Sequence, residues 1–212
     1  MRVVCLASGR GSNFEALVAA QGRGELGQAQ VVALGVNRPG CGALERAQAL
    51  GIPTFVEDHR AYSDRASFER ALCHQIGETG ADLVVLVGFM RVLTATFLEG
   101  VGMPVINLHP ALLPAFPGVQ GIEDAFSSGV RLSGCTTHLV TVAVDEGPIL
   151  MQGLVPILPT DQLADFKARV HGMEHRLLPA TVAALARGDL RYETQGLVTQ
   201  PDFQTFLLPA DR

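Results

Sequence analysis

The stretch Val105-Ile106-Asn107-Leu108-His109-Pro110 decides how this sequence is interpreted. An apolar run carries an amide and an imidazole, and a proline then ends the regular structure. Residues i and i+2 of a strand project from the same face, so Asn107 and His109 point the same way. The pair suits acyl transfer, since an amide can stabilise an oxyanion and an imidazole can move a proton. The alternative is a buried strand end whose polar groups are satisfied by the backbone.

Apolar runs alternate with helical patterns before this stretch, which indicates βαβ units and a mostly parallel sheet flanked by helices. We predict an α/β, Rossmann-like fold. The expected strands are 2–7, 31–36, 53–56 and 83–87, and the expected helices are 13–21, 43–50, 63–79 and 94–99. After it we expect helix 123–128, an antiparallel hairpin of strands 139–144 and 149–157, helix 162–187 and a loosely patterned tail 190–212.

The overall composition favours a single domain over residues 1–212, with the tail after about residue 188 peripheral. The chain has 212 residues, of which 48% are hydrophobic, and a net charge of −5. No basic stripe or membrane-length apolar run occurs, which argues against nucleic-acid and membrane partners. The four cysteines are scattered and include no C-x-x-C pair, so we expect reduced thiols in a cytoplasm.

The loop Ser8-Gly9-Arg10-Gly11-Ser12-Asn13 lies between a predicted strand and a predicted helix, which Asn13 is expected to cap. Amides at a helix start can bind an anion. The third glycine of a dinucleotide fingerprint is missing, and Asn37 replaces the acid that would hold a ribose. A phosphomonoester is therefore the favoured ligand, and a tight turn without a ligand is the alternative.

The segment His171-Gly172-Met173-Glu174-His175 matches the zinc pattern H-x-x-E-H. We favour the reading without metal, because a third ligand is lacking and Gly172 weakens the helix.

Three further histidines and one acid complete the polar candidates. His59 and His74 have no partner nearby in sequence and are expected at the surface or on the face of a helix. His138 begins an otherwise apolar strand and either lines a site or only pairs with threonine hydroxyls. Asp145 is expected at a hairpin tip, and beside His109 its carboxylate would stabilise the imidazolium.

Four motifs in order resemble the phosphoribosylglycinamide formyltransferases, folate-dependent enzymes of purine synthesis. The motifs are Ser8-Gly9-x-Gly11-Ser12-Asn13, Gly88-Phe89-Met90-Arg91-Val92-Leu93, Asn107-Leu108-His109-Pro110-x-Leu112-Leu113-Pro114 and Val144-Asp145-x-Gly147-Pro148. The resemblance covers Met1 to about Gly188. Other formyl-handling enzymes, which usually carry an extra domain, share the Asn-x-His-Pro motif and the later Asp.

The resemblance implies a role for each motif residue. The implied substrates are 5-phosphoribosylglycinamide and the formyl donor 10-formyltetrahydrofolate, and the protein is expected to be a monomer or homodimer. His109 is the implied general acid, Asp145 tunes it and Asn107 reaches the formyl oxygen. The implied phosphate site is Gly11, Ser12 and Asn13, with Glu174 near the ribose, and the implied folate contacts are Arg65, Met90, Arg91, Val92 and Leu93.

One departure and two rival functions remain. Gln120 stands where the family commonly has a histidine, which affects contacts expected from residues 115–122. The first rival is a formyltetrahydrofolate hydrolase that uses the same residues. The second is a non-catalytic folate- or phosphate-binding protein, which would have no need of a paired acid and oxyanion donor.

Overall fold

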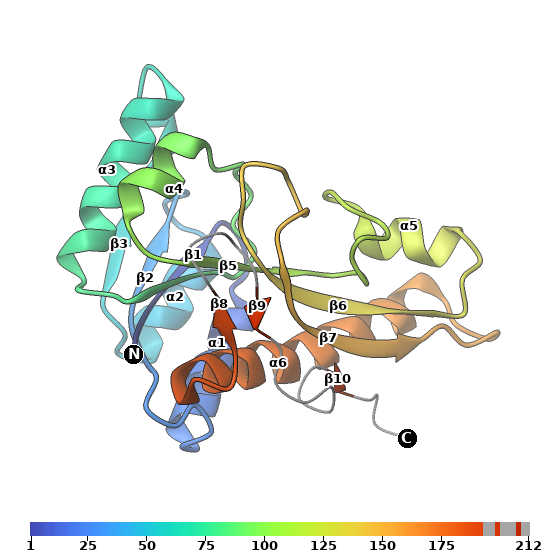
Figure 1. The fold of residues 1–212 in the computed structure, drawn as a ribbon. Coiled ribbons are helices and arrows are strands. Elements are labelled where there is room, and N and C mark those ends of the chain that lie inside the picture. Colours follow the sequence, from blue (N-terminus) through green and yellow to red (C-terminus); the bar gives the residue numbers. More distant parts are fainter. Residues whose placement is uncertain (193–197, 200–206, 209–212) are drawn as a thin grey trace. The chain divides into compact units, whose positions relative to one another are not determined.

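The computed structural model describes residues 1–192, 198–199 and 207–208. The chain forms two compact units, the first over Met1–Ile106 and the second over Asn107–Arg212. Figure 1 shows the elements of each unit. No helix in the described ranges is both long and apolar enough to span a bilayer.

The first unit is built on parallel strands in the order β4-β1-β2-β3. They are β1 (Arg2–Ala7), β2 (Gln30–Val36), β3 (Thr54–Val56) and β4 (Leu83–Leu86). In β1, Val3 to Ala7 are all buried, as expected for a strand covered on both faces. The predicted alternation of parallel strands and helices is thus confirmed in this unit.

The helices of the first unit begin close to their predicted positions. They are α1 (Ser12–Gly22), α2 (Gly42–Ala49), α3 (Arg65–Glu78) and α4 (Ala95–Val101), with a 3₁₀ turn η1 (His59–Ala61). Asp64 caps α3, because its carboxylate accepts a 2.8 Å hydrogen bond from the Ser67 amide. The prediction that Asn13 caps α1 is wrong, because Gly11 occupies the cap position with φ of 80°. A Cβ at Gly11 would lie 2.7 Å from Ala43 Cα, so this turn requires glycine.

The second unit carries a mixed arrangement of strands. Strand β5 (Val105–His109) begins at the end of the first unit along the sequence and continues into the second. Strands β6 (Leu132–Leu139) and β7 (Ile149–Pro156) form the predicted antiparallel pair. A short strand β10 (Leu207–Leu208) pairs in parallel with β7. In the predicted tail, β8 (Arg191–Tyr192) pairs with β9 (Val198–Thr199), and the rest of the prediction for 190–212 lies outside the described residues.

The first strand of the hairpin was placed wrongly in the sequence. We predicted 139–144, whereas β6 covers Leu132–Leu139 and Val142 and Val144 are exposed. Two threonines of β6, Thr136 and Thr137, find buried partners, which offset the cost of burying them. Thr136 Oγ1 donates to the Ala111 carbonyl at 2.7 Å, and the hydroxyls of Thr137 and Thr181 lie 2.9 Å apart.

Two helices complete the described part of the second unit. The long helix α6 (Leu163–Arg187) runs alongside β6 and β7 in Figure 1 and packs on both. It begins with a capping box between Gln162 and Asp165 and ends at Gly188, whose φ is 78°. The shorter α5 (Gly121–Ser127) joins it through a 2.9 Å ion pair between Lys167 and Glu123.

Candidate active site

The second unit brings three of the predicted site residues together. Asn107 and His109 lie on β5, and the His109 side chain is only 3% exposed. Asp145 lies in the loop after β6 with a left-handed φ of 59°. Its Oδ2 is 3.4 Å from His109 Nδ1, and its side chain is 10% exposed. The acid and the imidazole, 36 positions apart in sequence, therefore form a largely buried pair.

Both ring nitrogens of His109 face acceptors. Nε2 lies 2.8 Å from the Phe116 carbonyl oxygen, and a carbonyl can only accept, so Nε2 carries a proton. Nδ1 faces the Asp145 carboxylate. The Phe116 carbonyl and the Asp145 carboxylate thus contact the two nitrogens of the ring.

The loop after Pro114 fixes the positions of both members of this pair. Phe116 provides the carbonyl for His109, and the Gly118 amide donates a 2.8 Å hydrogen bond to Asp145 Oδ2. Gly121 approaches the ring so closely that a Cβ there would lie 3.1 Å from His109 Nε2. Gln120, the departure noted in the sequence, is exposed and directly precedes α5.

His138 joins the cluster and settles the alternative left open by the sequence. Its Nδ1 lies 2.9 Å from the Leu139 carbonyl and must donate to it, which leaves Nε2 as an acceptor. Nε2 is 3.2 Å from Asn107 Nδ2, so it accepts from that amide and orients it. Burial lowers the pKa of His138, although Asp145 nearby acts in the opposite direction, so this ring stays neutral.

The predicted phosphate site lies in the first unit at the start of α1. Gly11 accepts the first intrahelical hydrogen bond, from the Glu15 amide at 2.9 Å. The amides of residues 12–14 precede that bond and lie in the first turn of the helix. Amides in this position favour an anion. Ser12 and Asn13 are both partly exposed.

The predicted folate-contact residues also lie in the first unit. Met90 and Val92 are 62% and 52% exposed, whereas Leu93 is buried. The Arg91 guanidinium carbon lies 5.8 Å from the centre of the Phe68 ring, a cation–π contact. Arg65 is the first residue of α3 and is exposed.

Glu174 is buried on α6, with its Oε2 2.9 Å from His171 Nδ1. These two residues of the H-x-x-E-H segment thus form a pair one helical turn apart. Among the residues that the structure describes, no group of three or more His, Cys, Asp or Glu could hold a metal ion.

Comparison with known proteins identifies the class. Residues 1–182 match the formyl transferase family. The phosphoribosylglycinamide formyltransferase of Bacillus subtilis (strain 168) is 38% identical over 179 residues, which are 84% of this chain and 91% of that protein. The trifunctional purine biosynthetic protein adenosine-3 of Drosophila melanogaster is 39% identical over 188 residues, or 88% of this chain, and the match spans only 14% of that longer protein.

The solved structures agree with the sequence relatives. The glycinamide ribonucleotide transformylase 1 of Symbiobacterium toebii superposes with a TM-score of 0.89 at 36% identity and covers 95% of this chain and 94% of its own. The chain therefore belongs to the formyl transferase family. Within that family, its resemblance to the phosphoribosylglycinamide formyltransferases is confirmed over most of both chains, and so is the predicted enzyme class, a folate-dependent formyltransferase.

Proposed function

We propose that the protein transfers the formyl group of 10-formyltetrahydrofolate to the amine of 5-phosphoribosylglycinamide in purine biosynthesis. The observation that carries the proposal is the cluster of Asn107, His109 and Asp145, in which a buried acid faces a buried imidazole beside an oriented amide. The names of the relatives support the choice of substrates. We further propose a single functional domain in a cytoplasmic monomer or homodimer, acting without a metal.

The reaction begins when the substrate amine attacks the formyl carbon and negative charge develops on the formyl oxygen. A C–N bond forms, and the carbon becomes tetrahedral. Asn107 Nδ2 and His109 Nε2 are the donors for that charge. Loss of one such donor typically reduces the rate by about 10²–10³-fold. Because Nε2 donates to the Phe116 carbonyl in the structure, that bond must be given up before Nε2 can serve the formyl oxygen.

The second step breaks the bond between the formyl carbon and the folate nitrogen. The attacking nitrogen must lose a proton and the leaving nitrogen must gain one, so the step needs a proton carrier. Asp145, through water, accepts the proton from the amine, and His109 returns one to the leaving nitrogen. His138 stays outside the proton transfer, since its role is to accept from Asn107.

The remaining substrate contacts are proposed from the motif residues. Gly11, Ser12 and Asn13 are proposed to bind the phosphate through the α1 amides. Glu174 is proposed to contact the ribose. Arg65 and the segment from Met90 to Leu93, including Arg91 and Val92, are proposed to contact the folate. The exposure of Met90 and Val92 supports this assignment, because large apolar side chains at the surface commonly mark binding sites.

The test is a two-substrate assay on the wild-type protein and on His109→Ala. We expect His109→Ala to reduce kcat by at least about 10³-fold, with phosphoribosylglycinamide binding nearly unchanged. His74→Ala is the control, because His74 is exposed on α3. Normal turnover in His109→Ala would refute the proposed role. Rapid donor consumption without the amine would identify a hydrolase, and binding of both ligands without product would identify a non-catalytic protein.

A further inference from the structure

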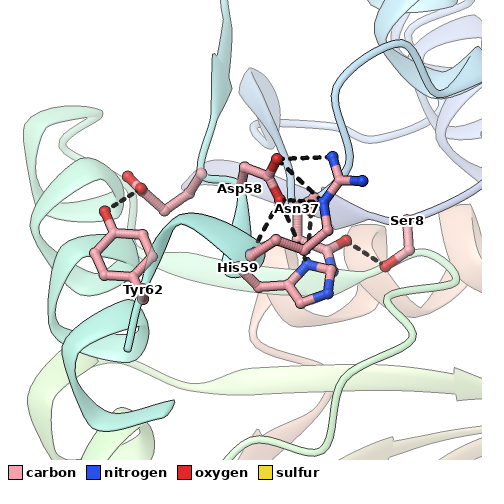
Figure 2. Close-up of polar contacts among 7 residues, drawn as sticks. Ser8, Asn37, Asp58, His59 and Tyr62 are labelled. Carbon is pink, nitrogen blue, oxygen red and sulfur yellow. Dashed lines mark hydrogen bonds and ion pairs between the residues drawn. The ribbon is translucent and has the colours of Figure 1, made fainter. Parts of the chain in front are cut away.

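A buried polar chain in the first unit has no part in the proposed chemistry. Figure 2 shows Ser8, Asn37 and His59 in contact at the ends of β1 and β2 and at the start of η1. Ser8 and Asn37 are 3% and 1% exposed. His59 is the first residue of η1, its side chain is 19% exposed, and its Nδ1 lies 2.9 Å from the Asn37 carbonyl oxygen.

The hydrogen bonds of this cluster converge on Asn37, which accepts from His59 on one side and from Ser8 on the other. The Asn37 carbonyl can only accept, so His59 Nδ1 carries the proton and donates it. The Ser8 hydroxyl donates to Asn37 Oδ1 at 2.6 Å. Having given its proton to Asn37, Ser8 Oγ accepts from the Met90 amide at 2.8 Å. His59 is therefore connected to the backbone of Met90 through Asn37 and Ser8.

The segment that receives this support has few bonds of its own. Residues 89–94 lie between β4 and α4 without helix or strand structure. Ser8 also fixes the start of the segment, because its amide donates to the Gly88 carbonyl at 3.1 Å. At the other end, the Thr94 amide donates to the buried carboxylate of Glu69 at 3.0 Å. Anchors at both ends hold an irregular stretch in one conformation.

His59 supports the same segment by a second route. Its ring makes an edge contact with Phe68, with centroids 6.3 Å apart. Phe68 in turn contacts Arg91, whose guanidinium lies over the Phe68 ring. Replacing the His59 ring by another flat ring preserves this packing route and removes the polar contacts of Nδ1, the hydrogen bond to Asn37 and the 3.9 Å approach to the Asp58 carboxylate. The two routes can therefore be separated by mutation.

We propose that Ser8, Asn37 and His59 are positioning residues that set the backbone of residues 90–93 for the formyl donor. The inference rests on the proposed contact between that segment and the folate. Asn37 is thus committed to the protein interior, although it ends the strand at which a dinucleotide-binding fold would hold a ribose. This hydrogen-bonded set of Ser8, Asn37 and His59, called the relay below, affects binding of the formyl donor and takes no part in the chemical step.

The decisive variants are His59→Phe and His59→Asn. Phe keeps a ring against Phe68 and removes the Nδ1 donor, whereas the Asn amide nitrogen can take the place of Nδ1. We expect His59→Phe to raise the KM for 10-formyltetrahydrofolate about tenfold, because a buried acceptor loses its partner. The KM for 5-phosphoribosylglycinamide and kcat should stay within about twofold of wild type. His59→Asn should return the donor KM to within about threefold.

His74→Phe is the matched control, an exposed histidine on α3 replaced in the same way. If His59→Phe fails to fold, Ser8→Ala is used in its place. This change removes one oxygen and with it both the hydrogen bond to Asn37 and the hydrogen bond from the Met90 amide. An unchanged donor KM, an equal rise in both KM values, or no recovery in His59→Asn would each overturn the proposal.

Amide hydrogen exchange at Met90 provides a readout that needs no turnover. Exchange should accelerate in His59→Phe and recover in His59→Asn, with His74→Phe unchanged. If the wild-type protein transfers no formyl group while this exchange pattern holds, the relay is supported and the proposed function is refuted. If formyl transfer is normal and Met90 exchange is the same in all variants, only the relay is refuted.

Discussion

Replacing Asp145 by Asn is the sharpest test of the buried acid–imidazole pair. The change removes one negative charge and keeps the shape of the side chain. Asp145 Oδ2 lies 3.4 Å from His109 Nδ1, and the two side chains are 10% and 3% exposed. The amide oxygen of Asn can still accept from the Gly118 amide, as Oδ2 does at 2.8 Å. The experiment therefore isolates the charge from the loop contact.

The expected effect of Asp145→Asn on kcat follows from the distance between the two side chains and from their burial. Two unit charges 3.4 Å apart interact by about 5 kcal/mol at an effective dielectric constant of about 20, which is a ceiling. Removing one partner of a buried pair typically costs about 3–5 kcal/mol. Because the Phe116 carbonyl still accepts from Nε2, we expect about 3–4 kcal/mol of the interaction between the two side chains to be lost. The corresponding fall in kcat is about 10²–10³-fold.

The assay is kcat at saturating concentrations of both substrates, with thermal unfolding measured on the same samples. Glu146→Gln is the matched control, because Glu146 is an exposed acid next to Asp145 in the same loop. A kcat for Asp145→Asn within threefold of wild type would refute the argument that the carboxylate supports the imidazolium. An equal loss in Glu146→Gln would show that total loop charge, and not the pair, controls the rate.

Two further predictions concern the second unit. Burial lowers the pKa of His138 from 6.5, so the unfolded chain takes up this proton at higher pH than the folded protein. The free energy of unfolding, measured by urea denaturation, should therefore fall as the pH drops through about 6.5. His138→Gln should flatten this part of the pH dependence. A Cβ at Gly134 would lie 1.8 Å from the Gly153 carbonyl oxygen, so Gly134→Ala should force β6 and β7 apart and lower Tm by about 6–12 °C for a cost of about 3 kcal/mol. The calorimetric control is Gly172→Ala, which meets no atom within 4 Å in helix α6 and should leave Tm unchanged or slightly raised.

The sequence predicted those elements whose hydrophobic pattern and function coincide. In β5 the apolar run, the proline and the spacing of Asn107 and His109 all point to a strand that ends in a site. The parallel strands of the first unit are equally clear, because continuous apolar runs alternate with helical patterns along the sequence.

The error in the hairpin has a specific physical origin. A single sequence assigns the strand to the apolar run after residue 139, since hydrophobicity is the main signal available. In the folded chain the threonines of β6 are buried because Ala111, Leu113 and Thr181 offer them hydrogen-bond partners. Those partners come from other segments of the chain, so no local pattern contains the information.

The same limit explains why His59 and His138 were not assigned from sequence. Each histidine acts on a residue far along the chain, His59 on Asn37 and His138 on Asn107. A motif records residues that touch a ligand at fixed spacing, whereas a positioning residue needs only a correct place in the fold. Histidine is suited to this task, because fixing one ring nitrogen as donor leaves the other available as acceptor.

The roles of the two histidines around Asp145 follow from their hydrogen-bond partners. His109 faces a carbonyl at 2.8 Å and a carboxylate at 3.4 Å, so both of its nitrogens are served best by protons. His138 gives its single proton to the Leu139 carbonyl and must keep Nε2 bare for Asn107. A second proton on His138 would turn its acceptor into a donor facing another donor, and Asn107 would have to turn away. The carboxylate thus lies 3.4 Å from a ring that gains from its charge and 3.6 Å from one that must stay neutral. Burial of His138 opposes its protonation, so its Nε2 stays available to accept from Asn107, the amide that the proposed reaction uses.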